Sequence, residues 1–183
     1  MQWSLVGSEM CIRDSPESVS ESSGSATATV TRVGDTTNAL TVTLTNGNST
    51  RISIPATVEI PATQPTVTFN VIIIDNDVVD SNESIIVLAA ADNLLAFDFI
   101  EVTNDDTAAL TLSSTPLDFP EDSGISNVTV TRNTIATDAL VVSLISSDLG
   151  EASVPATVTI PENQVSASFI VTGVDDMTVD GDQ

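Results

Sequence analysis

The sequence repeats itself after 100 residues, and this internal repeat limits the possible folds more than any other feature. Segments of mixed composition return in register without a gap. The stretch TVTR, residues Thr29–Arg32, returns as Thr129–Arg132, and PATV, residues Pro55–Val58, returns as Pro155–Val158. A period of this length is the size of a whole domain, so the repeat predicts two copies of one domain rather than a solenoid of small units.

Within one copy, apolar residues alternate with polar residues at every second position, as in the stripe Val67, Phe69, Val71 and Ile73. Such alternation is typical of strands with one buried face. It predicts about seven strands in the first copy, near residue 18 and at 26–33, 39–45, 51–60, 66–74, 84–90 and 97–103. The sequence therefore predicts an all-β fold of tandem immunoglobulin-like β-sandwiches with about seven antiparallel strands each. The second copy is expected to be truncated, because it stops where the first enters its sixth strand.

The first residues do not share this pattern. The stretch SLVGSEMCIRDS, Ser4 to Ser15, resembles the conceptual translation of a transposase-type sequencing adapter. We therefore expect residues 1–15 to be a non-native, adapter-derived scar outside the fold, followed by a complete sandwich at 16–106 and a second at 107–183 that lacks its last strands. Because Cys11 lies in the scar, we expect neither a disulfide nor a thiolate metal site.

The net charge of the chain limits the kinds of partner that it can bind. The chain has 26 acidic residues against 4 basic ones, all arginines, and a net charge of −22. Such a surface repels nucleic acid and anionic lipid and attracts cations. The sequence also has no histidine, lysine or tyrosine, so the usual general bases and nucleophiles are missing and we do not expect an enzyme. Arg32 and Arg132, late in a strand of each copy, are expected to pair with surface carboxylates or to lie over the sheet.

Acidic residues gather where the strand order brings loops together. In seven alternating strands, the loops after the first, third and fifth strands and the exit of the seventh lie at one end, which collects these acids: Glu21, Asp75, Asp77, Asp80, Glu83, Asp105 and Asp106. The second copy retains Glu121, Asp175, Asp176 and Asp180. Calcium suits such a site because it takes about 6 to 8 oxygen ligands in irregular geometry. The alternative is that these Asp and Asn residues only form turns at strand ends.

At these residues the sequence resembles the Calx-beta domain family. The motifs are VSESSGSATATVTR (Val19 to Arg32) with its echo FPEDSGISNVTVTR (Phe119 to Arg132), then IIIDNDVVDSNES (Ile72 to Ser84) with its echo VTGVDDMTVDGDQ (Val171 to Gln183), and TNDD (Thr103 to Asp106). The resemblance implies tandem calcium-binding sandwiches, with the seven acids of the first copy as ligands. The chain departs from the family in lacking an Asp-Tyr pair after the third strand, where Asn46, Asn48 or, in the second copy, Asp148 would have to supply an oxygen.

These observations together predict a structural or adhesion repeat module that binds Ca²⁺ and belongs to a secreted or surface-anchored multi-domain protein. Its expected location is extracellular or at the cell surface, with membrane anchoring of the parent protein. The expected partners are calcium, neighbouring repeats of the same chain, and cell-surface proteins or glycans, but not nucleic acid. Calcium bound beside Asp105 and Asp106 would stiffen the junction between repeats. The rival hypothesis is a calcium-independent immunoglobulin-like spacer whose acidity maintains solubility.

Overall fold

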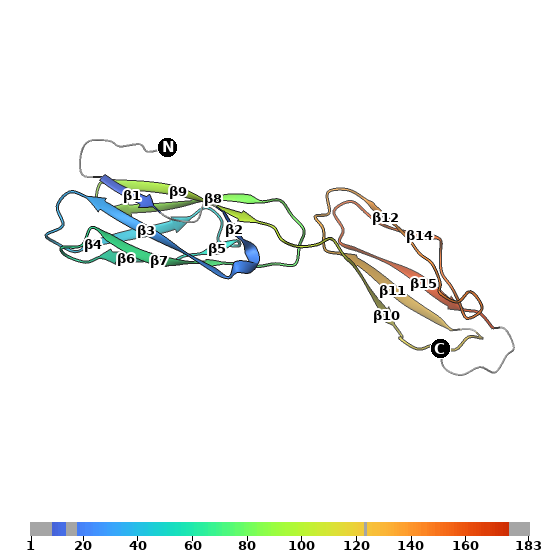
Figure 1. Ribbon diagram of the computed structural model, residues 1–183. Helices are drawn as coiled ribbons and strands as arrows, with labels where there is room; N and C mark the ends of the chain where they lie inside the picture. Colours follow the sequence, from blue (N-terminus) through green and yellow to red (C-terminus); the bar gives the residue numbers. More distant parts are fainter. Residues whose placement is uncertain (1–8, 14–17, 123, 176–183) are drawn as a thin grey trace. The chain divides into compact units, whose positions relative to one another are not determined.

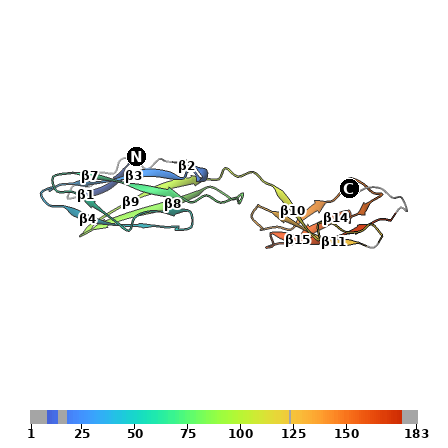
Figure 2. The same ribbon diagram turned by 90° about the horizontal axis from the view of Figure 1, so that it is seen from below.

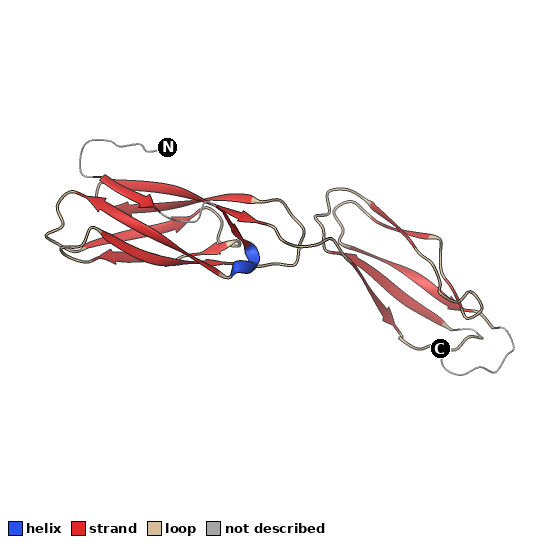
Figure 3. Cartoon of the chain, in the orientation of Figure 1, coloured by secondary structure: helices blue, strands red, loops and turns tan. Residues whose placement is uncertain are grey.

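The computed structural model describes residues 9–13, 18–122 and 124–175. The chain divides into two compact units, unit 1 (Met1–Asp105) and unit 2 (Asp106–Gln183). Strands dominate both units (Figures 1 and 3). The described residues include no helix with the length and apolar character of a membrane span.

Unit 1 is a sandwich of two sheets with immunoglobulin-like architecture (Figure 2). One sheet has the order β1–β3–β7–β5, formed by Glu9–Arg13, Ser25–Val33, Thr66–Ile73 and Ile52–Ser53. The other has the order β2–β9–β8–β4–β6, formed by Ser18–Ser20, Leu94–Thr103, Glu83–Ala91, Leu40–Asn46 and Thr57–Ile60. Neighbouring strands run antiparallel except β2 and β9, which are parallel. The predicted all-β sandwich is confirmed, and its alternating apolar residues, including Val30, Val71 and Ile85, form the buried core.

The predicted strand at 51–60 is two strands in different sheets. Ser53 of β5 pairs with β7 in the first sheet, whereas β6 from Thr57 pairs with β4 in the second. Pro55 lies between them, and a proline has no N–H to donate to a ladder. The chain therefore changes sheets at this proline.

The expectation that residues 1–15 stand outside the fold is wrong for Glu9–Arg13. This segment forms β1, which pairs along β3 with Met10 opposite Arg32 and Ile12 opposite Val30. Met10 and Ile12 are both 7% exposed and belong to the core. Met10 and Ile12 have the two-residue spacing of a strand with one buried face. Whether the segment derives from an adapter stays a prediction.

Unit 2 repeats part of this plan. One sheet has the order β10–β11–β15–β13, formed by Leu110–Thr115, Ile125–Arg132, Ser166–Gly173 and Ala152–Ser153, and a second pairs β12 (Leu140–Ser143) with β14 (Thr157–Ile160). β10 has the register of β1, since Leu110 lies opposite Arg132 as Met10 lies opposite Arg32. Among the described residues of unit 2, there are no counterparts of β2, β8 and β9.

The lack of these counterparts leaves the inner face of unit 2 open. An apolar cavity of about 290 Å³ lies between its sheets, lined by Leu112, Val128, Leu144 and Phe169 among others. In unit 1 the equivalent Phe69 is 6% exposed, whereas Phe169 is only half-buried. The paired strands β8 and β9 therefore provide the cover that completes the core of unit 1.

Arg32 and Arg132 bind backbone carbonyls, which corrects the expectation that they pair with surface carboxylates or lie over the sheet. Both are 6% exposed. The Arg32 guanidinium donates to the carbonyl oxygens of Asn38, Thr36, Pro61 and Gln64 at 2.7 to 3.2 Å. Arg132 donates in the same way to the carbonyls of Asp138 and Gln164. A guanidinium has five N–H donors and can therefore hold several loop carbonyls at once.

Candidate functional site

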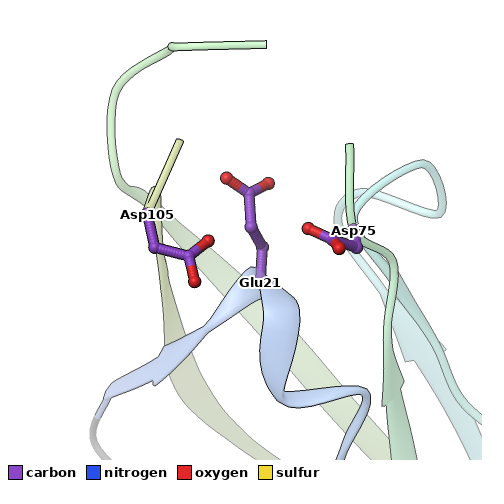
Figure 4. A group of neighbouring side chains, drawn as sticks. All are labelled: Glu21, Asp75 and Asp105. Atoms are coloured by element: carbon purple, nitrogen blue, oxygen red, sulfur yellow. The ribbon is translucent and has the colours of Figure 1, made fainter. Parts of the chain in front are cut away.

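Three acidic side chains from distant parts of unit 1 meet at one end of the sandwich. Glu21 begins the short 3-10 turn η1 (Glu21–Ser23) that follows β2, Asp75 follows β7, and Asp105 follows β9. One carboxylate oxygen from each lies within 4.8 Å of the others. Figure 4 shows the Glu21 side chain between the two aspartates. We call these three residues the acidic cluster.

Glu21 is the buried member of the acidic cluster, with no exposed surface. Its Oε2 accepts hydrogen bonds from Asn76 Nδ2 at 2.7 Å and from Arg51 Nη1 at 3.0 Å. Its Oε1 accepts a hydrogen bond from Asn104 Nδ2 at 2.9 Å. These donors stabilise a charge that would otherwise be costly to remove from water.

Arg51 connects Glu21 to two further predicted site residues. It lies directly before β5 and is 7% exposed. Its Nη2 lies 3.0 Å from Asp80 Oδ1, and its Nε lies 3.8 Å from Glu83 Oε2. We call Arg51 with Glu21, Asp80 and Glu83 the Arg51 network. One guanidinium therefore interacts with three carboxylates, and Asp80 and Glu83 are tied to it rather than to the acidic cluster.

Asn48, considered above as an oxygen donor for a cation, uses its amide differently. Its Nδ2 donates to both carboxylate oxygens of Glu83, at 2.9 and 3.0 Å. Its Oδ1 accepts from the backbone N–H and the hydroxyl of Thr50. Asn48 therefore orients Glu83 and closes its own turn, and its amide oxygen does not face the acidic cluster as a free ligand.

Asp105 is an exposed residue whose carboxylate is held by serine hydroxyls. Its Oδ2 accepts a hydrogen bond from Ser20 Oγ at 2.6 Å and another from Ser22 Oγ. The Ser20 and Ser22 hydroxyls hold the pKa of Asp105 below its usual value, because hydrogen bonds to the ionised form favour it. The carboxylate is thus kept charged and oriented beside Glu21.

The remaining predicted residues are placed as follows. Asp77 is exposed in the loop after β7, and Asp106 is half-buried at the start of unit 2. Neither belongs to the acidic cluster. In unit 2, Glu121 is half-buried and Asp175 is exposed. Asp176 and Asp180 lie outside the described residues, and the described acids of unit 2 form no group as close as the acidic cluster.

The charge at this end of unit 1 is strongly unbalanced. The acidic cluster and the Arg51 network together contain five carboxylates and one guanidinium, which leaves an excess of four negative charges. Ca²⁺ binds oxygens at about 2.3 to 2.6 Å, so two ligands of one ion lie up to about 5 Å apart. The separation within the acidic cluster, at most 4.8 Å, is of that order. Oxygen ligands with this spacing are compatible with a hard divalent cation.

Arg51 belongs to this site although its sequence pattern did not predict it. Its position in a predicted strand suggested only a ladder residue. One signal was present, because the internal repeat pairs Arg51 with Glu151, a reversal of charge at an otherwise corresponding place.

Comparisons with known proteins give likenesses of fold. The sequence matches no family model and no curated protein. Among solved structures, CBD12 from CALX1.2 has a TM-score of 0.48 and 14% identity, over 91% of this chain and 76% of that one. The calcium binding domain CBD12 of CALX1.1 has a TM-score of 0.45 and 15% identity, over 92% and 76%. The E. coli chaperone DraB has a TM-score of 0.42 and 8% identity, over 88% and 86%.

Proposed function

We propose that this chain is a calcium-binding structural module of the Calx-beta type, with the acidic cluster of unit 1 as its cation site. The observation that carries the proposal is the convergence of Glu21, Asp75 and Asp105, which come from three separate chain segments, to within 4.8 Å. Like charges at that distance repel one another unless a cation lies among them. A turn-forming role accounts for an aspartate at one strand end, whereas a cation site also gives a reason for the approach of three carboxylates from separate segments.

Calcium is the cation that this donor set favours. The three carboxylates supply only oxygen atoms, and water completes the coordination of Ca²⁺ in many sites. Asp75 and Asp105 are exposed, so water has access to them, whereas Glu21 is anchored in the protein. Magnesium demands a tighter octahedron at about 2.0 to 2.1 Å and releases its water reluctantly. Zinc prefers nitrogen and sulfur ligands, which this cluster lacks.

The role we assign to calcium is structural. Asp105 is the last residue of unit 1, so a cation bound to it would restrain the chain where one repeat ends and the next begins. That role suits an adhesion or spacer module in a secreted or surface-anchored repeat protein, with cell-surface proteins or glycans as partners. It needs no catalytic residue, and we assign none.

A calcium-independent spacer is the second candidate, and Arg51 is the observation that favours it. Its guanidinium already interacts with Glu21, Asp80 and Glu83. If that interaction suffices to hold the acidic end together, unit 1 folds without metal and its acidity serves solubility.

Thermal unfolding of the full chain in chelator, in calcium and in magnesium at equal ionic strength separates the two candidates. A cation that binds only the folded form stabilises it by about 2.7 kcal/mol at a hundredfold excess over Kd. For a domain of this size, the melting temperature should rise by roughly 10 to 20 °C. The double variant Asp75→Asn/Asp105→Asn should lose this response. Glu59→Gln, which changes an exposed acid on β6, is the matched control. Equal shifts from calcium and magnesium would indicate screening alone and would favour the spacer.

A further inference from the structure

Arg51 is a buried cationic residue in direct contact with the acidic cluster. Its side chain is 8% exposed and touches Glu21, which is also a member of the acidic cluster. Glu21 Oε2 therefore receives a guanidinium on one side, while a Glu21 carboxylate oxygen lies within 4.8 Å of the two aspartates. Any divalent cation bound by the acidic cluster would share Glu21 with Arg51 and be repelled by its charge.

The hydrogen bonding of Arg51 is also incomplete. Its Nε is buried and has no hydrogen-bond partner among the protein atoms, and Glu83 Oε2 lies 3.8 Å from it. A buried N–H without an acceptor costs free energy. The guanidinium therefore compensates carboxylate charge at this site, although one of its own N–H groups has no acceptor among the protein atoms.

Unit 2 has a carboxylate at the same backbone position. The carbonyl of Arg51 accepts a hydrogen bond from Ile74 N at 2.9 Å, and the carbonyl of Glu151 accepts one from Val174 N at 2.9 Å. The next residues, Ile52 and Ala152, pair with the last residues of β7 and β15 in the same register. Residue 51 of one copy and residue 151 of the other are thus structurally equivalent and opposite in charge.

The rest of unit 2 offers no arginine to replace Arg51. Its sequence contains one basic residue, Arg132, at the C-terminal end of β11. Glu121 precedes the other end of that strand, and Arg132 donates to the carbonyls of Asp138 and Gln164. Unit 2 therefore has no basic residue in its sequence that could take the place of Arg51 beside Glu121.

We propose that Arg51 is a built-in cation that competes with calcium for Glu21, so that it lowers the calcium affinity of unit 1 and reduces its need for metal. This inference rests on the proposed calcium site and concerns its regulation. A copy with glutamate at this position, as in unit 2, lacks the competitor and carries one more carboxylate. The identity of this one residue then sets how strongly unit 1 depends on calcium.

The test compares the full chain with Arg51→Gln and Arg51→Lys. Calcium is titrated at constant ionic strength, and the amide signals of Asp75 and Asp105 are followed by ¹H–¹⁵N NMR, which reads unit 1 alone. Arg51→Gln should tighten calcium binding about tenfold or more, because one charge at contact range shifts the ionisation equilibrium of a neighbouring carboxylate about ten- to a thousandfold. Arg51→Lys keeps the charge and should stay near the wild-type affinity. In chelator, Arg51→Gln should melt at a lower temperature than Arg51→Lys.

The outcomes separate the two proposals. If Arg51→Gln binds calcium more tightly than the wild-type chain, competition is supported. This holds even if the wild-type chain shows no measurable binding, a result that would overturn only the proposed calcium function of the wild-type chain. Equal affinity of wild type and Arg51→Gln overturns competition and leaves the calcium function standing. No response in any of the three chains overturns both. If Arg51→Gln is unfolded in chelator, recovery of the β-sheet circular dichroism signal with calcium supports the inference, and lack of recovery overturns it.

Discussion

Replacing Glu21 by glutamine tests the energetic role of the buried carboxylate. The change preserves the side-chain volume but leaves one acceptor atom in place of two. In the wild-type chain, Glu21 Oε2 accepts hydrogen bonds from Arg51 and Asn76, and Oε1 accepts one from Asn104. In either orientation of the glutamine amide, its NH₂ group faces at least one of these donors, and Arg51 loses one of its carboxylate partners.

The expected loss follows from the burial of both groups. Removing one partner of a buried ion pair costs about 3 to 5 kcal/mol. Because Arg51 retains Asp80 and Glu83, we expect the lower end of that range, about 3 kcal/mol. For a domain of this size, the melting temperature of unit 1 should fall by roughly 10 to 20 °C.

Differential scanning calorimetry of the full chain in chelator measures this loss, with Glu59→Gln as the control for removal of one negative charge. The double variant Glu21→Gln/Arg51→Gln should lose less than the sum of the two single variants, because both remove the same interaction. A loss below about 1 kcal/mol for Glu21→Gln, together with additive single changes, would refute the view that this buried pair organises the acidic end.

Two further predictions concern the edge strand and Asp105. Ile12→Ala should lower the free energy of unfolding of unit 1 by about 2 kcal/mol, because it empties a buried site on β1, whereas Cys11→Ala, on the opposite face of the strand, should cost little. Equal and negligible effects in calorimetry would place β1 outside the cooperative fold. Ser22→Ala should raise the pKa of Asp105 toward its usual value near 3.8, followed by NMR titration of the carboxyl carbon, with Ser18→Ala as the control. Because the pKa is depressed in the folded state, the stabilisation by these hydroxyls is present above about pH 4 and is lost as the pH falls below it. An unchanged titration would show that the Ser22 hydrogen bond has no effect on ionisation.

The period-two pattern predicts most strands of unit 1, because a strand of the sandwich has one buried and one exposed face. The exceptions have physical causes. At Pro55 the alternation continues across a change of sheet, so the pattern alone cannot show that β5 and β6 belong to different ladders. At β1, Met10 and Ile12 do alternate, but five residues are too few to stand out beside a stretch that resembles foreign sequence.

The convergence of Glu21, Asp75 and Asp105 could be predicted from strand order, since consecutive strands return their loops to alternate ends. It could not be predicted which of the acidic residues would join the acidic cluster and which would pair with Arg51. Asp80 lies in the same loop as Asp75, and Glu83 follows that loop as the first residue of β8, but whether a carboxylate meets Arg51 or the acidic cluster depends on side-chain direction. A sequence pattern carries no information on that direction in an irregular loop.

The two copies show how one scaffold can accommodate different amounts of negative charge at the same end. The backbone hydrogen bonds at residues 51 and 151 are equivalent, so the fold does not require either side chain. With arginine there, part of the repulsion among the surrounding carboxylates is compensated within the chain and the folded state needs less help from solution. With glutamate there, as in unit 2, the equivalent position carries one more carboxylate and no guanidinium. If Arg51 competes with calcium as we propose, residue 51 rather than the sandwich itself sets how strongly the stability of unit 1 depends on dissolved calcium.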